Sequence, residues 1–288
     1  MRVAIFAEDP DWHCRRLIAA FGHHGALVVT ESLRRCRFRI DAESAGVEIP
    51  ALGDGLPDAV LVRSVPNGSF EQVTFRLSLL HALGELGIRI VNEARAIERC
   101  VDKSMTSFLL RRAGVPTPPT FVTEEIEAAA AWHAAQASDV VAKPLFGAQG
   151  RGLRRIASNT ELPDPAADLN GVLYLQRYVG RDSEWRDFRV FVVGGTAVAA
   201  MTRRGAGWIT NVARGGRCEP ASIDGPLGAV AVAASRAVGA AYCGVDLIET
   251  GDGELVVLEV NSMPAWRGLQ SVAEIDIADR IARHVLAL

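Results

Sequence analysis

The stretch Val257–Trp266, "VLEVNSMPAW", has the pattern of a buried strand that carries two polar side chains, Glu259 and Asn261. Residues two apart in a strand project from the same face, so this carboxylate and this amide point the same way. Together they form a pair of oxygen donors. The alternative is a solvated sheet face on which the acid is merely exposed.

The preceding residues, "YCGVDLIETGDGEL", predict the partner strand of a hairpin. The dipeptide Asp252–Gly253 favours a two-residue turn. With that turn, Asp246 lies opposite Glu259 and Gly244 lies opposite Asn261. Three oxygen-bearing side chains are therefore expected on one face of the sheet.

Two carboxylates side by side repel each other unless a cation or a proton compensates them. Hard oxygen ligands suit Mg²⁺ that is bound together with substrate phosphates. We expect Ile248 and Val257 on the same face, where they would cover the acids. The hairpin therefore predicts a magnesium site.

The composition is that of an ordinary soluble protein: 288 residues, 49% hydrophobic and 23% charged. A formal net charge of −3 gives no reason to expect nucleic acid or an anionic membrane as the main partner. Five scattered cysteines without a C-x-x-C motif indicate reduced thiols and a cytoplasmic location. The N-terminus predicts a first strand and not a signal peptide, and no apolar segment is long enough to span a bilayer. A homo-oligomer remains open.

The order of patterns along the chain predicts three domains. Residues 1–92 alternate strand-like and helix-like runs, which indicates a parallel α/β domain, and the lack of a G-x-G-x-x-G motif removes the main support for dinucleotide binding. One helix is expected over "ARAIERCVDKSMTSFLLRRAG", residues 94–114, before a proline-rich linker. A central α+β lobe is expected to extend to residue 180, and a C-terminal α+β lobe covers residues 181–288.

The segment "VVAKPLFGAQGRGLRRI" places Lys143 at the end of an apolar strand, followed by Gly147, Gly150 and Gly152. Closely spaced glycines let backbone amides approach an anion. The order differs from a Walker A loop, and a glycine-rich flap between two strands fits better, with a plain hairpin turn as the alternative. A lysine at the end of a core strand requires an anionic partner.

Arginines supply further positive charge near the acidic hairpin. Two strands that flank Gly194–Gly195 carry Arg189 and Arg203, and "TNVARGG" adds Asn211 and Arg214. Fixed cations around a transferred phosphoryl group stabilise its charge. Each arginine taken alone is also compatible with a surface ion pair.

The motifs of nucleophilic and zinc enzymes are missing from the sequence. It has no G-x-S-x-G elbow and no H-E-x-x-H, and its six histidines fall outside the polar segments. The remaining interpretation is an ATP·Mg²⁺ site that activates a substrate by phosphorylation.

Six segments in this order resemble an ATP-grasp ligase of the RimK-like carboxylate–amine ligase family: "AKPLFGAQGRG", "YLQRYV", "DFRVFVVGG", "NVARGG", "GVDL" and "EVNSMPAW". The resemblance covers roughly residues 90 to 280. It implies an ATP-grasp fold, in which an N-terminal α/β domain precedes two α+β lobes that enclose ATP. It also implies a reaction in which ATP converts a carboxylate to an acyl phosphate that an amine then attacks.

The resemblance also assigns roles to residues. Asp246, Glu259 and Asn261 would hold two Mg²⁺ ions, with Mn²⁺ as an alternative, and Arg203, Arg214 and Lys143 would be the catalytic cations. The ATP contacts would come from Lys103, Lys143, Gly147, Gln149, Gly150, Gly152, Gln176, Arg177, Tyr178, Val179, Asp187, Arg189, Arg203 and Asn211. Arg177 departs from the acid of the ribosomal-protein-modifying relatives, which leaves the ribose contact to Asp182 or Glu184.

The segment after the metal strand, "SMPAWRGLQ", is similar to that of RimK-like enzymes for C1-carrier cofactors, including the tetrahydromethanopterin:α-L-glutamate ligases. This implies that L-glutamate is joined to the carboxylate of a small cofactor. Trp266 is then an aromatic wall for the acceptor, or simple packing, and Arg267 is a cation for it. The alternatives are glutamylation of a protein or peptide C-terminus, a kinase-like phosphotransferase, and an inactive nucleotide-binding protein.

Overall fold

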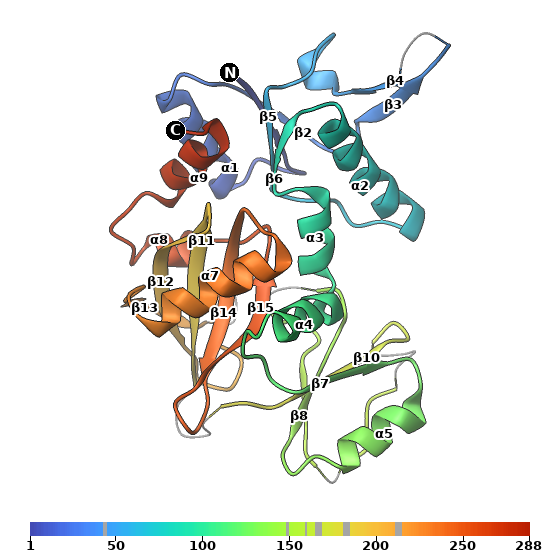
Figure 1. Ribbon diagram of the computed structural model, residues 1–288, viewed down its shortest axis with the longest axis vertical. Helices are drawn as coiled ribbons and strands as arrows, with labels where there is room; N and C mark the ends of the chain where they lie inside the picture. The colour runs from blue at the N-terminus through green and yellow to red at the C-terminus, as the bar shows by residue number, and fades with distance from the viewer. Residues whose placement is uncertain (43–44, 148–149, 159, 165–168, 181–184, 211–214) are drawn as a thin grey trace.

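In the computed structural model, the chain folds into three main sheets with helices packed on them (Figure 1). The structure describes residues 1–42, 45–147, 150–158, 160–164, 169–180, 185–210 and 215–288. The α/β and α+β architecture expected from the sequence is confirmed.

The first sheet is parallel, with the order β2-β1-β5-β6. Its strands are β1 (Arg2–Phe6), β2 (Leu27–Glu31), β5 (Ala59–Val62) and β6 (Arg89–Val91). Helices α1 (Trp12–His23) and α9 (Ile277–Leu286) share a core with one face, and α2 (Phe70–Glu85) shares a core with the other. Figure 1 shows the last helix beside the first. Apolar side chains on both faces of a parallel strand give the continuous apolar runs seen in the sequence.

Two features of the N-terminal half differ from the expectation. A hairpin, β3 (Arg37–Ile40) with β4 (Ala45–Glu48), and a short 3₁₀ turn, η1 (Pro50–Leu52), were not predicted. The single helix expected over residues 94–114 is wrong, because the chain forms α3 (Ala94–Val101) and then α4 (Lys103–Arg112).

Asp102 separates these two helices. Its backbone is extended, at φ −80° and ψ 101°, and its carboxylate accepts hydrogen bonds from the amides of Ser104 and Met105. An aspartate that bonds these amides is an N-cap, so it begins a new helix and does not continue the old one.

The central sheet is antiparallel, with the order β7-β10-β8-β9. Its strands are β7 (Thr120–Thr123), β8 (Val140–Lys143), β9 (Arg154–Ile156) and β10 (Leu173–Arg177). Helix α5 (Ile126–Ala134) shares a core with one face. The glycine-rich segment connects β8 to its antiparallel neighbour β9, a connection that fits both the predicted flap and its alternative, a hairpin turn.

The third sheet has the order β13-β12-β11-β14-β15 and is antiparallel. Its strands are β11 (Arg186–Val193), β12 (Thr196–Arg204), β13 (Arg217–Ala221), β14 (Tyr242–Glu249) and β15 (Leu255–Asn261). Helix α7 (Pro226–Val238) and part of α4 cover one face, and the short α8 (Arg267–Gln270) follows β15. Strands β7 and β13 were not anticipated.

Helices α3 and α4 pack against α7 and β15, and α9 packs against α1. Domain limits at residues 92 and 180 remain a prediction. The five cysteines are free thiols, as expected. In the described part of the chain, no helix combines the length and the apolar character needed to cross a membrane.

Candidate functional site: a pocket between two sheets

A pocket lies between the central sheet and the third sheet, on the faces that their helices leave uncovered. Along β8 and β10, alternate residues face α5, so Lys143 and Gln176 project into the pocket. Along the third sheet, the same alternation brings Asp187, Asp246 and Glu259 to the opposite wall. Polar residues two apart on apolar strands therefore converge from both walls.

The hairpin pairs Asp246 with Glu259 and Gly244 with Asn261, as predicted. The predicted turn is nevertheless wrong. The amide of Thr250 donates to the carbonyl of Glu254 at 2.8 Å, so the loop holds three residues and not two. The register recovers because β15 carries a bulge at Leu258.

The bulge also corrects the prediction that Val257 covers the acids. Val257 is paired with Leu247 and is buried in the core under α7. Leu258 lines the pocket in its place, together with Ile248. Apolar contact beside Glu259 is thus present, but a different residue provides it.

Two arginines and two aspartates form a buried network on the third sheet. Arg189 binds Asp246 with Nε on Oδ1 and Nη2 on Oδ2, each at 2.7 Å. Arg203 is 2% exposed and binds Asp187 through Nε at 2.8 Å and through Nη2, and its Nη2 also lies 3.2 Å from Asp246 Oδ2. Bidentate arginine–carboxylate pairs fix both partners geometrically.

The network sets the charge states of its members. Burial alone would raise the pKa of Asp246, but Arg189 and Arg203 lower it more, so this pKa lies below its ordinary value. Burial alone would lower the pKa of Arg203, but Asp246 and Asp187 raise it above its ordinary value. Asp246 and Arg203 are therefore both ionised at neutral pH.

Lys143 is buried on the opposite wall and forms no ion pair with a carboxylate among the described residues. Its Nζ donates to Gln176 Oε1 at 2.6 Å and lies 5.8 Å from the centre of the Tyr174 ring. Burial lowers the pKa of Lys143 to about 8, although Glu259 acts in the opposite direction. The anionic partner that the sequence called for is absent from the described side chains around it.

Glu259 and Asn261 also have unsatisfied bonding capacity. In the described part of the chain, the Glu259 carboxylate has neither an ion pair nor a hydrogen bond, and Asn261 Nδ2 is buried without a partner. No third carboxylate, thiol or imidazole joins Asp246 and Glu259 among the described residues. Such a pair suits a divalent cation whose other ligands come from a phosphate.

Most of the predicted ATP and metal residues line this one pocket: Lys103, Lys143, Gly147, Gly150, Gln176, Arg177, Tyr178, Val179, Asp187, Arg203, Asp246 and Glu259. Gly152, Arg189 and Asn261 do not line it. Arg189 instead clamps Asp246 from the side. Gln149, Asn211 and Arg214, like Asp182 and Glu184, lie outside the described residues.

Two predicted contacts have partners within the chain. Lys103 Nζ donates to the carbonyls of Gly147 at 2.9 Å and Leu145 at 3.3 Å, so it anchors the base of the flap. The Gln176 amide donates to Thr120 Oγ1 and Tyr174 Oη while its oxygen holds Lys143. These side chains position the wall of the pocket.

Sequence reasoning missed several aromatic and apolar pocket residues. Trp185, Trp208 and Ile209 line the pocket, and the Trp208 ring stands edge-on to Tyr178 at 6.2 Å. A further signal was available in the composition: Lys103 and Lys143 are the only lysines of the chain, and both lie in this pocket.

The interpretation of Trp266 as an aromatic wall is wrong. The side chain is 0% exposed and packs edge-on against Phe191, His13 and Trp12. The residue therefore belongs to the core between the first and third sheets. Arg267, the next residue, is exposed and lies over Trp12.

The fold and the pocket define an ATP-grasp ligase. The chain belongs to the RimK-like ATP-grasp family, because the model of the RimK-like ATP-grasp domain matches residues 100–285.

Relatives of known name extend the match over nearly the whole chain. The tetrahydromethanopterin:alpha-L-glutamate ligase of Methanococcus maripaludis is 33% identical over 99% of this chain and 98% of its own length. The protein of the same name from Methanocaldococcus jannaschii is 37% identical over 80% of this chain and 79% of its own. Among solved structures, the ATP-grasp ligase PsnB in complex with a minimal precursor, Mg and ADP has a TM-score of 0.74 at 23% identity, covering 99% of this chain and 97% of that one. This last similarity concerns the fold.

Proposed function

We propose that the protein joins the amine of L-glutamate to a carboxylate of a small C1-carrier cofactor of the tetrahydromethanopterin type, with ATP converted to ADP. The observation that carries this proposal is the pocket, in which the facing carboxylates of Asp246 and Glu259 lie across from the buried Lys143. The names of both relatives given above support the choice of substrates.

The donor set fits a magnesium nucleotide. In the described part of the chain, the Glu259 carboxylate has no bonded partner, Asn261 Nδ2 is unsatisfied, and the buried Lys143 forms no ion pair. Asp246, Glu259 and Asn261 would hold two Mg²⁺ ions, or Mn²⁺ in their place, and Lys103 and Lys143 would face the phosphates. When bound, the metal ions would neutralise phosphate charge and hold the transferred group in line.

The residues of the chain then supply position and charge. Arg203 is fixed by Asp187 and faces the place where phosphoryl charge would develop, so it would stabilise the transferring group without reorganising. Apolar side chains, among them Trp208, Ile248 and Leu258, would exclude water, which protects an activated carboxylate from hydrolysis. No nucleophilic side chain is required, because the amine attacks the acyl phosphate directly and inorganic phosphate leaves.

The experiment combines the protein with ATP, Mg²⁺, L-glutamate and tetrahydromethanopterin. We expect ADP release that requires both the acceptor and glutamate, and an acceptor heavier by one glutamyl residue. Glu259→Gln serves as the inactive control. Release of ADP without glutamate would indicate a kinase, and no release would indicate a binding protein. If a ribosomal protein tail were the sole molecule modified, that protein and not the cofactor would be the acceptor. A homo-oligomeric state and a cytoplasmic location remain predictions.

A further inference from the structure

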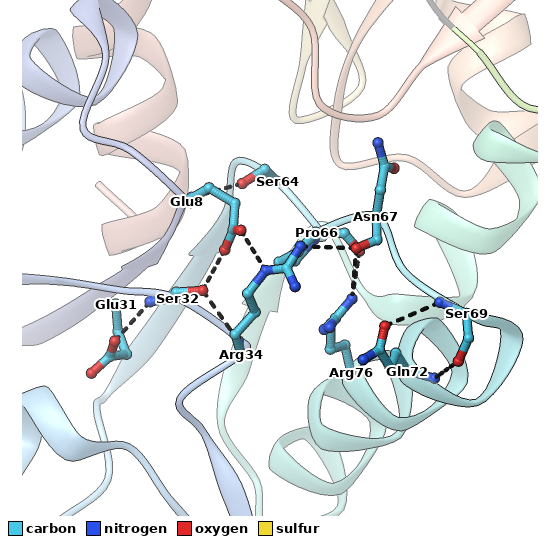
Figure 2. Close-up of polar contacts among 10 residues, drawn as sticks. All are labelled: Glu8, Glu31, Ser32, Arg34, Ser64, Pro66, Asn67, Ser69, Gln72 and Arg76. Carbon is cyan, nitrogen blue, oxygen red and sulfur yellow. Dashed lines mark hydrogen bonds and ion pairs between the residues drawn. The ribbon is translucent and has the colours of Figure 1, made fainter.

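A second polar region lies at the carboxyl edge of the first sheet, where the loops after β1, β2 and β5 meet (Figure 2). Glu8 donates its amide to Ser64 Oγ at 3.0 Å, and Arg34 donates from Nη2 to the carbonyl of Asn67 at 2.9 Å. Carboxyl edges of parallel sheets are common places for ligands. Arg63, next to Ser64, occupies the side of this edge that faces the third sheet.

Arg63 is a half-buried guanidinium whose closest described contacts are with neutral groups. Its Nη1 lies 3.3 Å from the hydroxyl of Tyr242, and its Cζ lies 4.8 Å from the centre of the Trp266 ring. Its Nε is buried and has no hydrogen-bond partner. Within the described ranges of the chain, no carboxylate forms an ion pair with it. A desolvated donor without a partner costs free energy, which a ligand can recover.

The carboxylates around Arg63 already have other partners. Glu8 binds Arg34 Nε at 2.7 Å and accepts from the hydroxyl of Ser32. Asp11 binds His13 Nδ1 at 2.6 Å and caps α1 through the amide of Cys14 at 2.9 Å. Asp11 therefore interacts with Arg63 at longer range only, and neither carboxylate forms an ion pair with it in the described structure.

The His13 imidazole and the Tyr242 phenol beside Arg63 also have other hydrogen-bond partners. The amide of Trp266 donates to His13 Nε2 at 3.1 Å, which assigns the ring proton to Nδ1 and leaves the ring neutral. The hydroxyl of Tyr242 donates to the carbonyl of Val62 at 2.8 Å, so it can only accept from Arg63. In the described structure, the guanidinium of Arg63 is thus left without a direct anionic partner.

Arg63 lies at the end of the same sheet face that carries the proposed metal residues. On β14, Tyr242, Gly244 and Asp246 project from the same face. Arg189, which clamps Asp246, also reaches the carbonyl of Ala265 through Nη1 at 3.5 Å, one residue before Trp266. One continuous sheet face therefore leads from the Asp246–Glu259 pair to Arg63.

We propose that Arg63 is the residue that binds a non-reacting carboxylate of a substrate, contributed either by L-glutamate or by the acceptor. A guanidinium offers two parallel donors to a carboxylate, and the free Nε with one Nη has this geometry. The inference rests on the proposed function, since it takes from there the two carboxylate substrates.

The test compares the affinity for a carboxylate ligand with the affinity for its amide, in wild type and in Arg63→Gln. Binding of L-glutamate, L-glutamine and L-glutamate α-amide is measured by calorimetry in the presence of ADP and Mg²⁺. Tetrahydromethanopterin is titrated separately, against derivatives in which each carboxylate is amidated. Arg16→Gln is the matched control, because Arg16 lies on exposed α1 surface in an ion pair with Asp276 at 2.6 Å.

We expect wild type to prefer one of these carboxylates over its amide at least tenfold, and Arg63→Gln to lose that preference while its affinity for ADP stays within twofold. Arg63→Lys should recover part of it. The ligand whose discrimination is lost identifies the source of the carboxylate. A merely structural role would weaken acid and amide equally, and that result would overturn the proposal.

Discrimination unchanged in Arg63→Gln, or lost only in Arg267→Gln, would also overturn it. The comparison of acid with amide can also be made on the wild-type chain alone. If the wild type binds every acid and its amide equally well, the proposal is refuted, even if the Arg63 variants fail to fold. Binding is measured without turnover. A protein that binds glutamate through Arg63 but never forms a glutamyl product would refute the proposed function and not this inference.

Discussion

The two sheets that form the pocket differ in whether their buried cations are paired with carboxylates. On the third sheet, Arg189 and Arg203 are neutralised by Asp246 and Asp187 within hydrogen-bond distance. On the central sheet, the one side-chain hydrogen bond of Lys143 among the described residues goes to the amide oxygen of Gln176. The first arrangement is complete without a ligand, whereas the second is costly until an anion arrives. The two arginines therefore stabilise the structure of the site, whereas the lysine is available to bind an anionic ligand.

The largest effect should come from Glu259→Gln, because this residue is the one carboxylate of the hairpin face left without a cation in the described structure. We expect turnover to fall at least a thousandfold, about 4 kcal/mol, with the melting temperature unchanged or raised. The measurement is ADP release at saturating Mg²⁺, with Glu254→Gln on the exposed hairpin loop as control. Activity like that of wild type would refute the metal assignment.

Arg203→Ala should damage both folding and turnover, since it leaves Asp187 and Asp246 buried with less compensation. We expect the free energy of unfolding to fall by about 3 kcal/mol and turnover to fall more than tenfold. Its neighbour Arg204 is 40% exposed and pairs with Glu219, so Arg204→Ala should cost less than about 1 kcal/mol. Denaturant unfolding of the two variants checks this, and equal losses would contradict the network.

Lys143→Met should lower activity but raise stability. Removing a buried cation whose one described side-chain hydrogen bond goes to a neutral amide should raise the free energy of unfolding by about 1 to 3 kcal/mol at pH 7. The folded pKa of about 8 is below the ordinary 10.5, so the unfolded chain binds more protons between these values. Wild-type stability therefore rises with pH over that window, and the advantage of the variant should disappear above it. A gain independent of pH would exclude this cause.

The smallest effect is a shift of the Lys143 titration itself. With only two lysines in the chain, a lysine-labelled NMR spectrum should show two side-chain signals, one of which titrates near pH 8. Lys103→Arg assigns the remaining signal to Lys143. Addition of a magnesium nucleotide should raise this pKa, because a phosphate would stabilise the charged form. An unchanged midpoint would mean that no phosphate approaches Lys143.

Much of the pocket could be predicted from the sequence because its chemistry depends on strand alternation. Lys143, Asp246 and Glu259 stand on short apolar strands, where a period of two leaves little choice of face. The turn at Asp252–Gly253 was misread, and the correct pairing survived only because the bulge at Leu258 offsets the longer loop. A bulge has no sequence signal of comparable strength.

Other errors arose where long-range packing decides the outcome. Trp266 follows the metal strand in sequence, but contacts with His13 and Phe191 bury it between sheets. Asp102 had a capping signal that could have been recognised, an aspartate within a helical pattern. The aromatic lining from Trp185 and Trp208 comes from loop segments, whose course a periodic pattern does not specify.

The packing of α9 on α1 has a consequence for biosynthesis. Leu17 and Phe21 of α1 share a core with Ile281 and Val285 of α9, and His24 binds Asp279 at 2.7 Å. At roughly 5 to 20 residues per second, the ribosome needs roughly 13 to 50 s to make the chain between the two helices. During that time the part of α1 that packs on α9 stays uncovered, while the rest of its apolar face can already pack on the first sheet.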